Sequence, residues 1–209
     1  MALLSLFELI DIVLMSACIG YIFAGHFGRY NTFKKPNHYD VIGVRRFNWS
    51  DFAFSIAVVG PAIFLHELGH KFVAMSFGYD ATFFSAISIN KVVNGMPFFD
   101  FATILMIIAL VSTYIGASFF FFVPAYVAFS SLATPFQQML IAFAGPLVNL
   151  ILWRGSIMLV KQRKVSHKYI PVTILTSNIN KLLFIFNMIP FPGFDGFYVL
   201  TGLFSSIFG

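Results

Sequence analysis

Long runs of apolar residues, separated by short polar stretches, dominate the pattern of this chain. Five of the runs reach the roughly 20 residues that a helix needs to cross the hydrocarbon core of a bilayer, and a sixth is shorter. An isolated strand in lipid would leave its backbone groups unpaired, so the runs are predicted to be helices. The predicted helices cover residues 2–24, 52–77, 100–123, 135–160, 169–189 and 197–209.

Two connecting segments differ from simple turns. Residues 28–51 are polar, basic and aromatic, which is typical of a segment at a membrane surface. Residues 78–98 contain the alternating run Phe84-Ser85-Ala86-Ile87-Ser88-Ile89, followed by Asn94-Gly95. Alternation favours strands, and Asn-Gly is a common hairpin turn. We therefore predict a short β or re-entrant segment, with strands or a hairpin, directly after the second helix.

Composition supports a membrane location. Hydrophobic residues make up 59% of the chain and charged residues 10%, and the mean hydropathy is +0.87. A soluble domain usually carries about 25% charged residues to cover its surface. The sequence therefore predicts an all-α, multi-pass protein of the cell membrane, with about five or six membrane helices forming a single domain over residues 1–209.

The formal net charge of +5 does not indicate nucleic acid as a partner. The basic residues gather in two short loops beside apolar runs, where cations meet lipid headgroups. The predicted partner of this charge is the lipid bilayer. The residues concerned are Arg29, Lys34, Lys35, Arg45, Arg46, Lys161, Arg163, Lys164 and Lys168.

The second predicted helix contains the motif His66-Glu67-Leu68-Gly69-His70. Residues four apart share one face of a helix, so both imidazoles can reach one ion. Glu67 lies about 100° further round, where its carboxylate can reach a water on that ion. A zinc ion acidifies such a water, and a carboxylate can take the proton as a carbonyl is attacked. Ionisable groups within an apolar segment are usually functional, so a catalytic type of metal site is predicted.

A catalytic zinc ion needs a third protein ligand. Asp195 is the acidic residue that stands out, because two prolines and two glycines break the helix just before and after it. Irregular backbone near membrane depth is tolerated only where it lines a cavity or is buried in protein. A helix N-cap is the alternative role for Asp195. Asp51 and Asp100 are expected at helix starts, and His26, His38 and His167 in solvated loops.

Three segments together resemble a known family. They are the 66–70 motif, the segment 187–196 with the pattern Asn-x-x-Pro-x-Pro-x-x-Asp-Gly, and Gly145-Pro146-Leu147-Val148-Asn149. This combination is similar to the site-2 protease family of intramembrane zinc metalloproteases. The matching segments lie in residues 52–77 and 135–200, which form the expected catalytic core.

The resemblance implies a role for each matched residue. One Zn²⁺ ion would be held by His66, His70 and Asp195, and Glu67 would be the general base. The substrate would be a transmembrane protein.

The resemblance also implies residues that bind the substrate. Asn149 is a candidate for holding the substrate carbonyl or its oxyanion, with interhelical hydrogen bonding as the alternative. Asn187, together with the turn at Pro190 and Pro192, would help to hold an unwound substrate.

If Asp195 lies beside His66 and His70, the chain can cross the membrane in only certain ways. His66 lies about 14 residues into its helix, roughly 21 Å along it, and Asp195 follows the end of helix 169–189. The two meet only if both helices run in the same direction. Simple crossings by 100–123 and 135–160 would place Asp195 at the wrong end. We therefore predict that residues 99–134 do not make one simple crossing.

The predicted activity is hydrolysis of a peptide bond in a transmembrane substrate helix. A non-proteolytic zinc-binding membrane scaffold or assembly factor is the alternative. Glu67 argues against it, because a structural site needs no base and is usually closed by a fourth protein ligand. A zinc transporter would need several ligand sets along its path, and the sequence offers one.

Cysteine labelling tests the predicted path of residues 99–134. Cysteines introduced at Asn94 and Ser131, in a chain with Cys18→Ser, are expected to react with a membrane-impermeant reagent from the same side. Labelling of the two positions from opposite sides would contradict the prediction.

Overall fold

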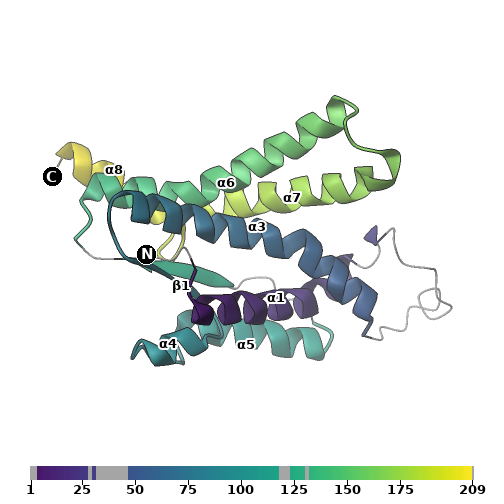
Figure 1. Cartoon of the computed structure of the whole chain (residues 1–209), viewed down its shortest axis with the longest axis horizontal. Helices are drawn as coiled ribbons and strands as arrows, with labels where there is room; N and C mark the ends of the chain where they lie inside the picture. The colour runs from purple at the N-terminus through teal and green to yellow at the C-terminus, as the bar shows by residue number, and fades with distance from the viewer. Residues whose placement is uncertain (1–3, 28–29, 32–46, 118–122, 130–131, 209) are drawn as a thin grey trace.

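The computed structural model describes residues 4–27, 30–31, 47–117, 123–129 and 132–208. These residues form mostly helix, with one small sheet of two strands (Figure 1). In chain order the elements are α1 (Leu6–Phe27), α3 (Trp49–Ser76), β1 (Ala81–Ser85), α4 (Ile89–Val93), α5 (Phe101–Tyr114), β2 (Ala125–Phe129), α6 (Pro135–Lys161), the 3-10 helix η2 (His167–Tyr169), α7 (Ile170–Asn187) and α8 (Asp195–Phe208).

Four helical stretches in the described part of the chain are long and apolar enough to cross a membrane. They are α1, α3, α6, and η2 together with α7. Helices α5 and α8 are also apolar but have 14 residues each. A helix of that size is about 21 Å long, which is less than the thickness of the hydrocarbon core. Four of the predicted membrane helices therefore have the length of a crossing.

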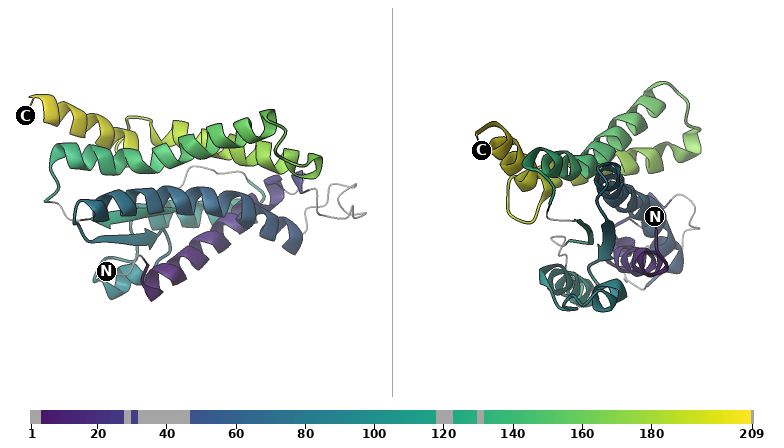
Figure 2. Two further views of the ribbon diagram at one scale, coloured as in Figure 1. Left: turned by 45° about the horizontal axis from the view of Figure 1, so that its top comes forward. Right: turned by 60° about the vertical axis from the view of Figure 1, so that its left-hand side comes forward.

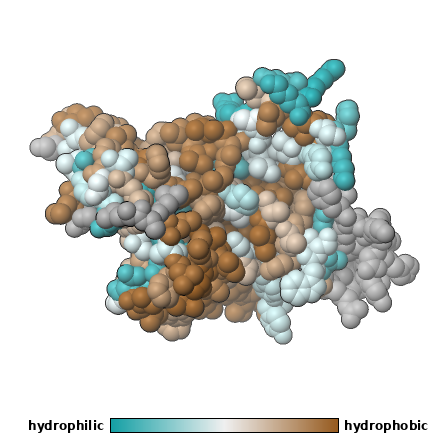
Figure 3. Space-filling view, in the orientation of Figure 1, coloured by the Kyte–Doolittle hydropathy of each residue, from teal (hydrophilic) through white to brown (hydrophobic). Residues whose placement is uncertain are grey.

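The surface of the molecule is rich in exposed apolar side chains. The exposed fractions of Trp49, Phe72 and Phe204 are 74%, 66% and 68%. Figure 3 shows hydrophobic residues over much of one face, with hydrophilic residues gathered around the turn between α6 and α7. This distribution agrees with the apolar exterior that the composition predicted.

Polar side chains fix where the helices begin. Asn48 caps α3 by accepting the N–H groups of Ser50 and Asp51. Asp100 caps α5 by accepting the N–H of Thr103 at 2.8 Å. Such caps satisfy N–H groups that have no partner within the helix. The expectation that Asp51 and Asp100 mark helix starts is confirmed.

The predicted hairpin at Asn94-Gly95 is wrong, although a strand does follow α3. Strand β1 pairs with the distant strand β2 in antiparallel register, with Ala81 opposite Phe129. Ser88 accepts the N–H of Lys91 and starts α4, so the chain turns into a helix before a return strand can begin. Asn94 and Gly95 end that helix, with Gly95 at φ +71°.

The predicted helix 100–123 is shorter in the structure. Helix α5 ends at Tyr114, and Gly116 has a φ of +80°, a conformation that terminates helices. Strand β2 then runs back along β1, and the chain enters α6. The hydroxyl of Tyr79, just beyond α3, donates to Gln137 in the first turn of α6 at 2.8 Å.

Helix α6 therefore starts at the end of the molecule where α3 finishes. Helices α3 and α7 run in the same direction, as Figure 1 and the left view of Figure 2 show. This is the arrangement that the prediction for residues 99–134 requires.

Helix α3 occupies the centre of the molecule. Helices α6 and α7 pack on one side of it, and α1 and the sheet pack on the other (Figure 1). Helix α5 packs against α1, and α8 packs against α6. A buried apolar cluster that includes Ile19, Val58, Phe83 and Ile179 joins α1, α3, the sheet and α7. Other elements thus surround the 66–70 motif of the central helix.

Two of the three other histidines belong to described helices. His26 was expected in a loop but belongs to the last turn of α1. The apolar run that forms α1 extends three residues beyond its predicted end, so the helix includes it. His167 is exposed in η2, as expected, and His38 lies outside the described residues together with most of the segment 28–51.

Candidate metal centre

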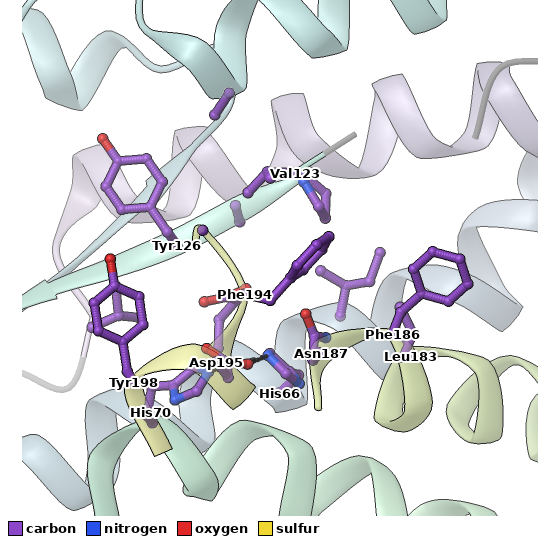
Figure 4. Close-up of a pocket in the computed structure, with 18 of the residues that line it drawn as sticks. His66, His70, Val123, Tyr126, Leu183, Phe186, Asn187, Phe194, Asp195 and Tyr198 are labelled. Atoms are coloured by element: carbon purple, nitrogen blue, oxygen red, sulfur yellow. Dashed lines mark hydrogen bonds and ion pairs between the residues drawn. The ribbon is translucent and has the colours of Figure 1, made fainter. Parts of the chain in front are cut away.

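The structure brings the three predicted metal ligands together. His66 and His70 lie one turn apart on α3 and are exposed by 5% and 7%. Their Nε2 atoms are 3.1 Å apart. Asp195 Oδ2 lies 3.1 Å from Nε2 of His66 and 3.4 Å from Nε2 of His70 (Figure 4). These residues form one group whose ligand atoms all lie within 4.8 Å of one another.

A tight turn between α7 and α8 delivers Asp195 to the histidines. Gly193 has a φ of +99°, which a residue with a side chain rarely adopts. A Cβ atom on Gly196 would lie 2.4 Å from the carbonyl oxygen of Met188, so this close approach requires glycine. Asp195 is the first residue of α8. The Pro- and Gly-rich sequence therefore acts by fixing a turn that points one carboxylate at α3.

Hydrogen bonds behind the histidines determine which ring nitrogens face the aspartate. Nδ1 of His70 lies 2.7 Å from the carbonyl oxygen of Ile141, which can only accept. Nδ1 of His66 lies 2.6 Å from Oδ1 of Asn149. In the neutral form, each ring therefore carries its proton on Nδ1 and presents the lone pair of Nε2 to the site.

Asn149 is itself held by two further bonds. Its Nδ2 donates to the carbonyl oxygen of Ala62 at 3.2 Å and to Oδ1 of Asn180 at 2.9 Å. These donor contacts orient the amide so that its oxygen faces His66. Asn149, Asn180 and the carbonyl of Ile141 thus orient the ligands, a function that such outer contacts have in metal sites.

The donors fit a metal ion. Two imidazole lone pairs and one carboxylate oxygen face one another, and Asp195 Oδ2 has no hydrogen-bond donor in the described structure. Ligand atoms around a tetrahedral ion with bonds of about 2.0–2.1 Å are about 3.3 Å apart. The three separations here are 3.1, 3.1 and 3.4 Å. Electron-rich atoms so close together are stabilised by a cation between them.

Two glycines allow α6 to approach this part of α3. A Cβ on Gly69 would lie 3.1 Å from the carbonyl oxygen of Ala144. A Cβ on Gly145 would lie 2.3 Å from Nε2 of His70 and 2.7 Å from Nε2 of His66. Only hydrogen fits at position 145, so the backbone of α6 forms one wall of the site.

A cavity of about 1070 Å³ lies beside the donors. His66, Glu67, His70 and Asp195 line it, and Glu67 is exposed by only 5%. Most of the remaining wall is apolar and comes from α1, α7 and strand β2. Figure 4 shows Val123, Leu183, Phe186 and Phe194 around this space.

A polar group at the margin of the cavity was not predicted. Nζ of Lys91 lies 2.7 Å from Oδ2 of Asp100, and the hydroxyl of Tyr126 donates to the same oxygen at 3.3 Å. Burial raises the pKa of the Asp100 carboxyl, but the bonds from Lys91 and Thr103 outweigh this and lower the pKa overall. Burial, and then the charge of Asp100, raise the pKa of Tyr126 to about 12.

A sequence signal for this group did exist. Lys91 is the one basic residue between Lys71 and Arg154, and it lies nine positions before Asp100. An isolated lysine and aspartate in an apolar region are usually paired.

The residues expected to bind substrate occupy different positions. Asn187 lines the cavity beside Asp195 (Figure 4). Asn149 is fully buried behind His66 and is not among the lining residues, so its contacts match the interhelical alternative. Pro190 and Pro192 are exposed and do not line the cavity. The two prolines shape the turn before Asp195.

A methyl group at position 145 tests the placement of α6 against the ligands. Gly145→Ala is expected to lower the metal content of the purified protein by about tenfold or more, because the new Cβ displaces both imidazoles. Elemental analysis measures the metal per chain. Gly155→Ala on the same helix is the control, since its Cβ meets no atom within 4 Å. Equal metal content in the two variants would contradict the geometry described here.

Comparison with protein families, curated proteins and solved structures finds no match to this chain. The site contains two buried histidines and one partly buried aspartate that can hold a metal ion, beside a glutamate and a large, mostly apolar cavity.

Proposed function

We propose that this chain is an integral membrane zinc metalloprotease that hydrolyses a peptide bond in a transmembrane substrate. The observation that carries the proposal is the group of the buried His66 and His70 with the partly buried Asp195, and Glu67 on the wall of the same cavity. A metal site that serves only stability needs neither a carboxylate base beside it nor a large cavity.

Zinc is the proposed ion because of the ligand types and their number. Two imidazoles and one carboxylate, arranged for a tetrahedral site with one open position, are typical of catalytic zinc. When bound, zinc supplies a Lewis acid that lowers the pKa of a water molecule and polarises the scissile carbonyl.

Glu67 is the proposed general base. It takes a proton from the attacking water and delivers it to the leaving amine, which is the usual function of a carboxylate in this position. Because Glu67 follows His66 directly on α3, the rigid helix fixes the distance between base and ligand. Its burial keeps bulk water away from the carboxylate and strengthens its electrostatic effect.

An extended apolar peptide fits the cavity best as substrate. The walls contributed by Ile179, Leu183 and Phe186 are apolar, and residues 123–129 run along the opposite side. A peptide that enters this space in extended form can pair with a strand edge and place its side chains against apolar walls. The candidate strand is β2, all of whose residues line the cavity.

The proposed membrane arrangement has four crossings. Helices α1, α3, α6 and α7 alternate in direction and supply the crossings, while α5 and the sheet enter and return on the same side (Figure 2). The cell membrane is the proposed location, and the bilayer and a transmembrane protein are the proposed partners. No interaction with nucleic acid is proposed.

A non-proteolytic zinc-binding scaffold or assembly factor is the second candidate. Such a protein would retain the three-ligand site. A scaffold function, however, does not explain why Glu67 and the cavity lie beside that site. A zinc transporter is less well supported, because the described residues contain one group of three potential ligands and a transport path needs several.

Substitution of the base separates the protease from the scaffold. Glu67→Gln is expected to slow cleavage of a membrane substrate by at least about 10²-fold, because the amide cannot accept the proton. Its metal content should remain that of the wild type, since the amide leaves the three ligands in place. Both quantities are measured on protein reconstituted in liposomes.

His66→Ala provides the comparison, because it should lose metal and cleavage together. Cleavage by Glu67→Gln at the wild-type rate would rule out Glu67 as the base. Absence of cleavage by the wild type, with metal bound, would favour the scaffold.

A further inference from the structure

Two carboxylates on α1 are buried in the folded chain. Glu8 is exposed by 2% and Asp11 by 0%. They lie three residues apart and so share one face of the helix. Carboxylates are retained in such surroundings only where specific partners compensate for the loss of water. Their partners therefore indicate what the two residues do.

Both carboxylates accept backbone N–H groups of strand β1. Glu8 Oε1 accepts the N–H of Phe83 at 2.7 Å, and Asp11 Oδ2 accepts the N–H of Ser85 at 3.1 Å. Glu8 also forms a buried ion pair with Lys71, and Asp11 accepts the hydroxyl of Ser88.

These contacts cover the outer edge of the sheet. Phe83 and Ser85 are two residues apart in β1, so their N–H groups point to the same side of the strand, which is the side away from β2. The carbonyl of Phe83 is covered as well, because Nδ2 of Asn90 donates to it at 3.1 Å. Side chains thus take the place of a third strand on this edge.

The opposite edge of the sheet is open. Val127 and Ala125 stand opposite Phe83 and Ser85, so these are the pairs that exchange no hydrogen bonds in the ladder. Their own N–H and C=O groups therefore point away from β1. Within the described part of the chain they meet no hydrogen-bond partner, and both residues line the cavity that contains Glu67 and the metal ligands.

We propose that Glu8 and Asp11 are positioning residues for the substrate. By covering the outer edge of β1 they fix the sheet on α1, and they leave β2 as the edge on which an extended peptide pairs beside the metal centre. Lys71 follows His70 directly, so the Glu8 ion pair also joins this assembly to the helix of the ligands. The proposal rests on the proposed function, because it assigns the peptide to the same cavity.

Two double variants isolate the edge contact from the ion pair. Glu8→Gln with Lys71→Met and Glu8→Ala with Lys71→Met both lack the charges, but only the first keeps an acceptor for Phe83. Relative to the wild type, the alanine double variant is expected to have a KM for a membrane substrate about tenfold higher, because one hydrogen bond to β1 is lost. Its kcat should stay within about twofold of the wild-type value. The glutamine variant should have the KM of the wild type. Equal KM values in the two would overturn the proposal.

Asp11 gives the same comparison at a second contact. Asp11→Asn keeps an acceptor for Ser85 and is expected to retain the wild-type KM, whereas Asp11→Ala should raise it. Asp51→Ala removes a buried carboxylate at the far end of α3 and is the matched control. An equal rise in KM for Asp51→Ala and Asp11→Ala would show a general loss of stability and overturn the positioning function.

Cross-linking measures positioning without hydrolysis. In a Cys18→Ser, Glu67→Gln chain, Val127→Cys is expected to form a disulfide with a substrate that carries a cysteine. Asp11→Ala should reduce this cross-link, and Asp11→Asn should not. If the cross-link follows this pattern while the wild type cleaves nothing, positioning stands and the proposed protease fails. If the wild type cleaves the substrate but the cross-link is the same in both Asp11 variants, the positioning function is overturned and the proposed protease activity is not.

Discussion

The structure depends on three electron-rich atoms that are held close together in a buried place. Nε2 of His66, Nε2 of His70 and Oδ2 of Asp195 lie 3.1–3.4 Å apart, with no hydrogen-bond donor directed at the carboxylate oxygen. Such an arrangement is electrostatically costly without a cation, so the surrounding fold must impose it. Asn149 and the carbonyl of Ile141 impose the ring orientations, and the turn before α8 imposes the position of the aspartate.

This constraint explains how the neighbouring helices pack. Gly145 faces both imidazoles and Gly69 faces the backbone of α6, so α3 and α6 approach more closely than helices with larger residues could. The chain must also bring Asp195 back to the same end of α3. The excursion through α5 and β2 achieves this, because β2 runs back along β1 and the chain then enters α6 beside the end of α3.

The sheet connects this centre with α1. Buried carboxylates of α1 cover one edge of β1, and the other strand borders the cavity. Edge strands present unpaired N–H and C=O groups, and here each edge of the sheet has a distinct environment. The position of β2 relative to the metal ligands therefore depends on α1, although no residue of the three sequence motifs lies in that helix.

The sequence alone determined the helices and most of the candidate metal site. Long apolar runs predict helices whatever their packing, and the i, i+4 spacing of His66 and His70 places both rings on one face. The segment around Pro190 and Gly193 predicts irregular backbone beside Asp195, which is typical of a residue that faces a cavity. Tertiary structure decided the rest, because it depends on residues distant in the chain: β1 pairs with β2, Asn149 lies behind His66, and Asn180 orients Asn149. Local patterns contain no information about such partners, so only the folded chain shows that Glu8 and Asp11 contact the sheet.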